Sequence, residues 1–300
     1  YATQFPESGY EVPEVSEELL QDNQISMIFA CCNPKLSQEY QLILTLKILG
    51  GLSIKEIATA LMKKEATVAK AYSRAKQRFQ QENLPIKIPS EASIGNRLNM
   101  VLQTIYLLFN EGYKSTEGSQ VIRQDLCFEA MRLNQLLLEK KETNNEWTRA
   151  LMSLMHFHAS RFEARVGESG RIIPLKDQDR GKWDQLHIAL GNRYLTTIKH
   201  GQQNAYFLQA AISGIHAAAP SYEQTQWPHI LTLYDQLYRL KPHAIILLNR
   251  LIPLSHVKGP ETALEELIKL KKAQQLQDLY LLHATEAELL TQLGQKQQAK

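Results

Sequence analysis

The chain has 300 residues, of which 44% are hydrophobic, and its formal net charge at pH 7 is +3. This length and apolar content exclude a disordered chain and predict more than one folded unit, while the low content of glycine and proline favours long helices over a turn-rich β fold. No apolar run reaches the roughly 18 residues that a membrane-spanning helix needs, so no membrane partner is expected.

The first 24 residues are acidic and contain no lysine or arginine. Pro6, Gly9 and Pro13 interrupt this stretch, and no helical periodicity is sustained across it. Residues 1–24 are therefore predicted to form a linker or arm.

Two helices are predicted next. The first runs through ISMIFACC and stops before Asn33-Pro34, because a proline disfavours the helical conformation of the residue that precedes it. Ser37 is a good N-cap for the second, EYQLILTLKIL, which Gly50 and Gly51 end.

The following stretch predicts a helix-turn-helix. Ser53 and Glu56 form the S-x-x-E pattern of a capping box and begin a short helix, IKEIATALM. A second helix begins near Ala66, and its apolar face consists of Val68, Tyr72, Ala75 and Phe79, spaced 4, 3 and 4 residues apart. The small side chain of Ala58 lets the two helices cross closely, and the short turn between them is typical of the motif.

The opposite face of this second helix is basic. It carries Thr67, Lys70, Arg74 and Arg78 at helical spacing, and Lys63 and Lys64 lie in the turn before it. A recognition helix meets the major groove with such a face, and its N-terminus favours phosphate. DNA binding is therefore expected here, and a merely solvated basic face is the alternative.

The segment LPIKIP cannot continue a helix, so the DNA-binding domain is predicted over residues 25–84, a linker over 85–96 and a helical extension over 97–300. Helical spacing of apolar residues predicts helices over 97–113, 123–140, 146–166, 182–198, 205–219 and 227–242. Gly259 and Gly294 are 35 residues apart, and Ala263 and Ala299 are 36 apart. This period suits stacked helix pairs of the tetratricopeptide kind, so the fold is predicted to be all-α.

Several polar and aromatic features predict structure rather than chemistry. Adjacent Cys31 and Cys32 and the single Cys127 fit no disulfide framework or metal motif and are expected to be buried thiols in a reducing cytoplasm. His156 and His158 lie on different faces of a helix and so cannot share a metal.

The cluster of Asp177, Asp179, Arg180 and Asp184 predicts an ion-paired loop. The tryptophans Trp147, Trp183 and Trp227 predict packing between helices. No phosphate-cradling glycine loop and no nucleophile elbow are present, so no enzyme, cofactor or metal is expected.

The run LTLKILGGLSIKEIATALMKKEATVAKAYSRAKQRF resembles region 4 of extracytoplasmic-function (ECF) sigma factors. The blocks IFACCNPKLS, LLFNEGYKSTEG, RQDLCFEAMRL and LKDQDRGKWD resemble, in the same order, the subgroup with a long tetratricopeptide-like C-terminal extension. The resemblance implies that the helix-turn-helix reads the −35 promoter element and contacts the flap of core RNA polymerase. It also implies that Thr67, Lys70, Ala71 and Arg74 face the DNA.

The chain departs from the family pattern at two positions. Ala71 replaces a residue that is basic in many sigma factors, and Met62 replaces the common turn glycine. Region 2, which melts the −10 element, has no counterpart in these residues, and the acidic arm then corresponds to the linker between regions 2 and 4. We expect a cytoplasmic fragment of a longer protein.

The extension is expected to bind an unknown protein or ligand that regulates activity. A one-component regulator that binds DNA as a dimer is the alternative function. A third possibility is a scaffold whose basic helix meets an acidic protein surface.

Overall fold

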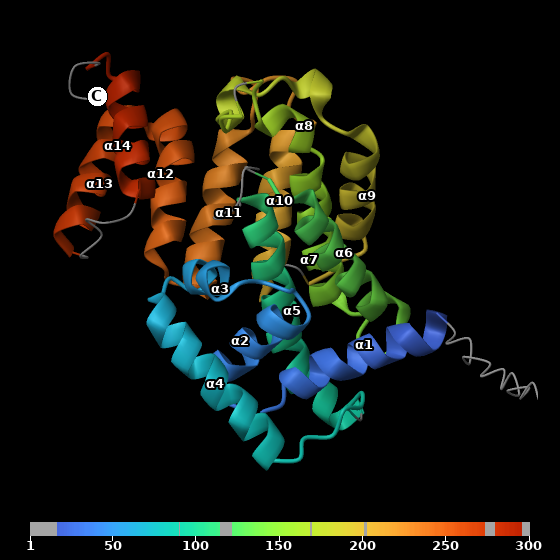
Figure 1. Cartoon of the computed structure of the whole chain (residues 1–300). Coiled ribbons are helices and arrows are strands. Elements are labelled where there is room, and N and C mark those ends of the chain that lie inside the picture. The colour runs from blue at the N-terminus through green and yellow to red at the C-terminus, as the bar shows by residue number, and fades with distance from the viewer. Residues whose placement is uncertain are drawn as a thin grey trace, which may run out of the picture.

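The computed structural model describes residues 17–89, 91–114, 122–168, 170–200, 203–273 and 280–295. Within these residues the chain forms helices joined by short turns, with one isolated antiparallel bridge between Val166 and Ile172 and no strand (Figure 1). The prediction of an all-α fold is confirmed.

The helices fall into an N-terminal group, a long connecting helix and a larger second group. The N-terminal group consists of α1 (Glu17–Cys31), α2 (Gln38–Ile48), α3 (Ile54–Ala60) and α4 (Glu65–Gln81). The connecting helix is α5 (Glu91–Tyr113). The second group consists of α6 (Gln124–Glu139), α7 (Glu146–Ala159), α8 (Phe162–Arg165), α9 (Gln185–Thr196), α10 (Ala205–Ala218), α11 (Trp227–Leu240), α12 (Ala244–Lys258), α13 (Pro260–Ala273) and α14 (Tyr280–Gln292), with short 3₁₀ turns η1 (Leu175–Asp177) and η2 (Arg180–Lys182) before α9.

Several helices differ from the predicted pattern: among them, α5 begins at Glu91, inside the predicted linker, and α14 was not predicted. Helix α1 begins at Glu17, inside the stretch predicted as an arm; residues 1–16 of that arm lie outside the described part. The helix predicted over 146–166 is broken after Ala159, where the Ser160 carbonyl accepts a hydrogen bond from the Asp184 backbone N–H at 2.8 Å. Helix α12 was not predicted, and it contains Pro253 in its interior.

Helix α5 joins the two groups through one continuous core. Its buried side chains, such as Val101 and Phe109, belong to the same cluster as Phe29 of α1, Leu46 of α2 and Ala210 of α10. Figure 1 shows α5 running from the N-terminal group into the middle of the second group. The extension therefore contributes part of the core against which the helix-turn-helix packs. The domain boundary at residues 85–96 stays a prediction.

The C-terminal helices α12–α14 pack around a second buried cluster, to which α11 contributes Leu231. This cluster also includes Leu248 of α12, Leu267 of α13 and Leu289 of α14. Gly259 and Gly294 have positive φ angles of 91° and 74°, which suits the place each one holds at the end of a helix. Both glycines thus follow a helix at the predicted period, although at different cap positions. Ala299 lies outside the described residues, and a tetratricopeptide relationship stays a prediction.

None of the helices in the described ranges is long and apolar enough to cross a membrane.

Candidate nucleic-acid interface

The first helix of the helix-turn-helix begins with the predicted capping box. The Ser53 hydroxyl accepts a hydrogen bond from the Glu56 backbone N–H at 3.1 Å, and the Ser53 N–H donates to Glu56 Oε2 at 2.6 Å. Two N–H groups at the helix start are satisfied in this way, which fixes where α3 begins.

The turn between α3 and α4 is a Schellman motif centred on Met62. The Lys63 N–H donates to the Ala58 carbonyl at 2.7 Å, and the Met62 N–H donates to the Thr59 carbonyl at 3.0 Å. Met62 has a φ of 52°, in the left-handed region that favours glycine. The chain keeps the turn geometry of the motif although it lacks the glycine.

The inner face of α4 packs against α2 and α3. Val68 and Ala75 are fully buried, and Ala58 of α3 lies in the same cluster as Val68. The small Ala58 side chain therefore sits where the two helices meet, as the sequence predicts.

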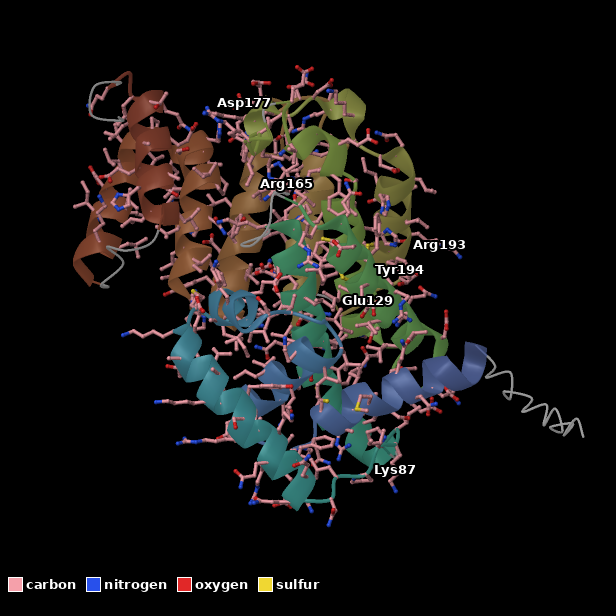
Figure 2. The ribbon with its side chains drawn as sticks, viewed as in Figure 1. Lys87, Glu129, Arg165, Asp177, Arg193 and Tyr194 are labelled. Atoms are coloured by element: carbon pink, nitrogen blue, oxygen red, sulfur yellow. The ribbon has the colours of Figure 1, made fainter. Side chains whose placement is uncertain are left out.

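The outer face of α4 is polar and points to solvent. Six of the predicted DNA-binding residues are exposed there or in the turn before it: Lys63, Lys64, Thr67, Lys70, Arg74 and Arg78. Figure 2 shows a row of long, nitrogen-tipped side chains that project from α4 away from the body of the protein. Ala71 is placed differently from the other predicted residues: it is only 8% exposed and packs in the core.

These basic side chains differ in whether an acid already neutralises them. Lys63 pairs with Glu39 at 2.7 Å, and Arg78 pairs with Glu82 at 2.6 Å. Lys64, Lys70 and Arg74 have no ion-pair partner among the described residues. Among the predicted DNA-binding residues, the charge available to an outside anion therefore lies on Lys64, Lys70 and Arg74.

A groove of about 250 Å³ runs between the start of α2 and residues 66–74 of α4. It is lined by Glu39 and Tyr40 of α2 and by Ala66, Thr67, Lys70, Ala71 and Arg74 of α4. Glu39 and Tyr40 were not predicted as site residues, although the Ser37 cap marks the nearby helix start; the Tyr40 N–H donates to Ser37 Oγ at 3.3 Å. Only the packing of α2 on α4 brings these side chains to the groove.

An ion pair ties the helix-turn-helix to the second group. Arg123, which precedes α6, donates from Nη1 to Glu56 Oε1 at 2.6 Å, and its Nη2 lies 3.1 Å from Asp125 Oδ2. The Glu56 side chain is only 5% exposed, whereas that of Asp125 is 65% exposed. Glu56 therefore closes the capping box with one oxygen and holds the extension with the other.

The cysteines are free and buried, as expected. Burial raises the pKa of Cys31 and Cys127 to about 12 and that of Cys32 to about 11. These thiols are therefore protonated at neutral pH and poor nucleophiles.

The two histidines of α7 contact different partners. His156 Nδ1 lies 2.9 Å from His187 Nδ1, and His158 Nδ1 lies 2.7 Å from Arg161 Nη2. The described residues contain no group of three side chains that could hold a metal ion. Of the tryptophans, Trp183 and Trp227 are buried and Trp147 is 37% exposed.

The prediction of an ion-paired loop at residues 177–184 is wrong. Asp179 accepts from the Gly181 N–H at 2.9 Å, and Asp184 caps α9 by accepting from the His187 N–H at 3.0 Å. Arg180 donates instead to the backbone carbonyls of His216 and Ala219, at the end of α10. Both aspartates are used by nearby backbone N–H groups, which is why they do not pair with the arginine.

Comparison with known proteins identifies two regions of the chain. Residues 26–79 match the family described as sigma-70, region 4, and residues 97–199 match a family of unknown function (DUF6596). An uncharacterized protein of Rhizobium meliloti is 35% identical over 280 residues, which cover 93% of this chain and 66% of that protein. The chain thus spans slightly less than two thirds of that relative's length. No solved structure matches.

Proposed function

We propose that this chain, which carries a sigma-70 region 4 match over α1–α4, is part of an ECF-type sigma factor. In this proposal α4 reads the −35 promoter element while the module contacts core RNA polymerase. The observation that carries the proposal is the exposed basic face of α4, which borders a groove and keeps Lys70 and Arg74 free of ion pairs with described residues.

The start of α4 suits a phosphate. Its N-cap, Lys64, makes no side-chain hydrogen bond to the helix, so no side chain satisfies the first N–H groups. Those N–H groups and the helix dipole favour a negative charge, and Thr67 lies exposed in the first turn. Phosphate contacts here would fix the register of α4, while Lys70 and Arg74 reach into the major groove.

The extension would regulate this activity through a partner or ligand. The ion pair between Glu56 and Arg123 and the core shared with α5 support this part of the proposal, because a change in the second group would be transmitted to the base of the helix-turn-helix.

The test is fluorescence anisotropy of the chain with a −35-like duplex and a scrambled duplex at low and moderate salt. We expect binding that weakens with salt and prefers the promoter sequence. Combining Lys70→Ala with Arg74→Ala should weaken binding by roughly 1–3 kcal/mol for each base-edge interaction that the variant removes, and it should lower the salt dependence. The matched control combines Lys182→Ala with Arg193→Ala, which removes two exposed charges outside α4.

Unchanged affinity in the α4 double variant would contradict the assignment. Binding to symmetric half-sites by a dimer, without affinity for polymerase, would favour a one-component regulator instead.

A further inference from the structure

Arg161, which follows α7, and Arg165 of α8 lie near Arg180 of η2. Arg161, Arg165 and Arg180 are all half-buried, and none of them forms a salt bridge with any described acid. Figure 2 shows Arg165 inside the helical bundle, below the loop that carries Asp177. Burying one unpaired positive charge is costly, and gathering three is more so.

Two aromatic rings hold the arginines next to one another. The Arg165 guanidinium lies 3.9 Å from the centroid of the Tyr113 ring, and that of Arg161 lies 5.9 Å from the same ring. Arg161 and Arg180 lie 5.7 Å and 4.8 Å from the Trp183 ring. Arg161 therefore lies near both rings, and each ring also has one other arginine beside it: Arg165 at Tyr113 and Arg180 at Trp183.

Several buried hydrogen-bond donors of the cluster have no acceptor among the described residues. They are Nε of Arg161, Nε of Arg165, Nη2 of Arg180 and Nε1 of Trp183. The Tyr113 and Trp183 side chains are themselves more than nine-tenths buried. A native protein leaves few such groups unsatisfied, and here they gather around one set of positive charges.

The same charges act on neighbouring histidines. Burial, together with Arg161 and Arg165, holds the pKa of His158 well below its ordinary value, and burial with Arg161 and Arg180 lowers the pKa of His216 to about 3. Both imidazoles are neutral at pH 7, so they add no further positive charge. His216 also lines a cavity of about 260 Å³ beside Trp227, but none of the three arginines lines that cavity.

We propose that Arg161, Arg165 and Arg180 bind the oxyanion of a small ligand, with a phosphoryl group as the chemistry that fits best. A phosphoryl group offers several oxygens to donors that arrive from different sides, and the arginine fork matches its geometry. Stacking on aromatic rings alone offsets only part of the cost of three buried charges. The site lies in the extension and does not depend on DNA binding by α4.

The probe is inorganic phosphate, and the measurement is the thermal midpoint of the whole chain in phosphate and in sodium chloride of equal ionic strength. We expect phosphate to raise Tm by about 2 °C or more at millimolar concentration, because a ligand that binds only the folded state stabilises it. Equilibrium dialysis should show a phosphate bound at this site in addition to any held elsewhere.

Arg161→Gln should remove most of the Tm shift while leaving Tm in chloride unchanged or slightly raised, since like-charge repulsion is relieved. The control, Arg193→Gln, removes an exposed arginine of α9 and should keep the full shift. Any phosphate at α4 is present in both variants, so their difference belongs to the cluster.

Two results would overturn the proposal: a phosphate effect no larger than that of chloride, or a full shift in Arg161→Gln. If that variant does not fold, Arg165→Lys keeps the positive charge but removes the paired N–H donors of the guanidinium. A full phosphate-induced Tm shift in Arg165→Lys would equally count against an arginine-bound oxyanion.

Discussion

Met62 holds a backbone conformation that costs a non-glycine residue free energy. Its φ of 52° closes the Schellman motif between α3 and α4, and its side chain is 68% exposed. The side chain therefore gains little from packing to offset the strain. The position shows how a helix-turn-helix can keep its turn geometry with an unfavourable residue when the surrounding hydrogen bonds fix the backbone.

Met62→Gly is expected to stabilise the chain by about 1 kcal/mol, because glycine adopts the left-handed conformation without a steric penalty. The measurement is the urea midpoint followed by circular dichroism. Met62→Ala serves as the control, since it keeps the Cβ atom and should change the midpoint little. A midpoint that falls in the glycine variant would show that the turn is not strained.

At the scale of the element, α3 is held from two sides. Glu56 completes its own capping box and accepts a hydrogen bond from Arg123, so one buried carboxylate connects the start of α3 to the start of α6. Helix α4, by contrast, buries the small and β-branched residues Val68, Ala71 and Ala75, with Tyr72 and Phe79 partly buried beside them. A helix packed through such small side chains lies close to its neighbours and leaves its long basic side chains outside.

Arg123→Ala is expected to destabilise the chain by roughly 1–3 kcal/mol, because the buried Glu56 oxygen loses its charged donor. The matched control is Asp125→Asn, which removes the exposed partner of the same arginine and should cost less than about 1 kcal/mol. Hydrogen exchange would locate the effect, with α3 expected to lose protection first. Equal effects of the two substitutions would contradict the bridging role of Glu56.

At the scale of the whole molecule, the N-terminal helices and the extension share one large buried hydrophobic cluster. Besides Tyr113, helix α5 contributes seven apolar side chains to the buried cluster: Ile94, Leu98, Val101, Leu102, Ile105, Leu108 and Phe109. Burying each is worth about 1.5–3 kcal/mol, and their sum is comparable to or larger than the net stability of a typical domain.

A chain that ends at Pro89 is therefore expected to lose cooperative unfolding, because the inner faces of α1 and α2 would lose the wall that α5 provides. A chain that ends at Pro242 removes α12–α14, whose buried cluster includes only Leu231 of α11 from the remaining helices, and should still unfold cooperatively. Thermal unfolding followed by circular dichroism distinguishes the two. A stable fold in the shorter fragment would mean that the helix-turn-helix is autonomous.

Much of the local structure follows from neighbouring residues. The capping box at Ser53, the N-cap at Ser37 and the helical spacing of Val68 and Ala75 each depend on residues within one or two turns. Helix α12 forms although Pro253 lies inside it, and a proline in a helix interior normally argues against the helix.

The candidate interface was predictable only in part. The basic row on α4 follows from periodicity, whereas the inward turn of Ala71 and the contribution of Glu39 and Tyr40 depend on how α2 crosses α4. Likewise, the spacing of Asp179 and Arg180 indicates an ion pair, yet each side chain finds a backbone partner instead. Pairing between charges is decided by the full set of competing donors and acceptors, which one segment does not contain.

The sequence by itself determined the all-α class, the helix-turn-helix and the basic face of α4, because caps, turns and helical periodicity are short-range properties of the chain. The tertiary structure alone decided that α5 serves both halves as one core, that Glu56 meets Arg123 and that three arginines gather around Tyr113 and Trp183. These contacts join residues far apart along the chain, and their geometry is set by how whole helices pack, a property that no local pattern encodes.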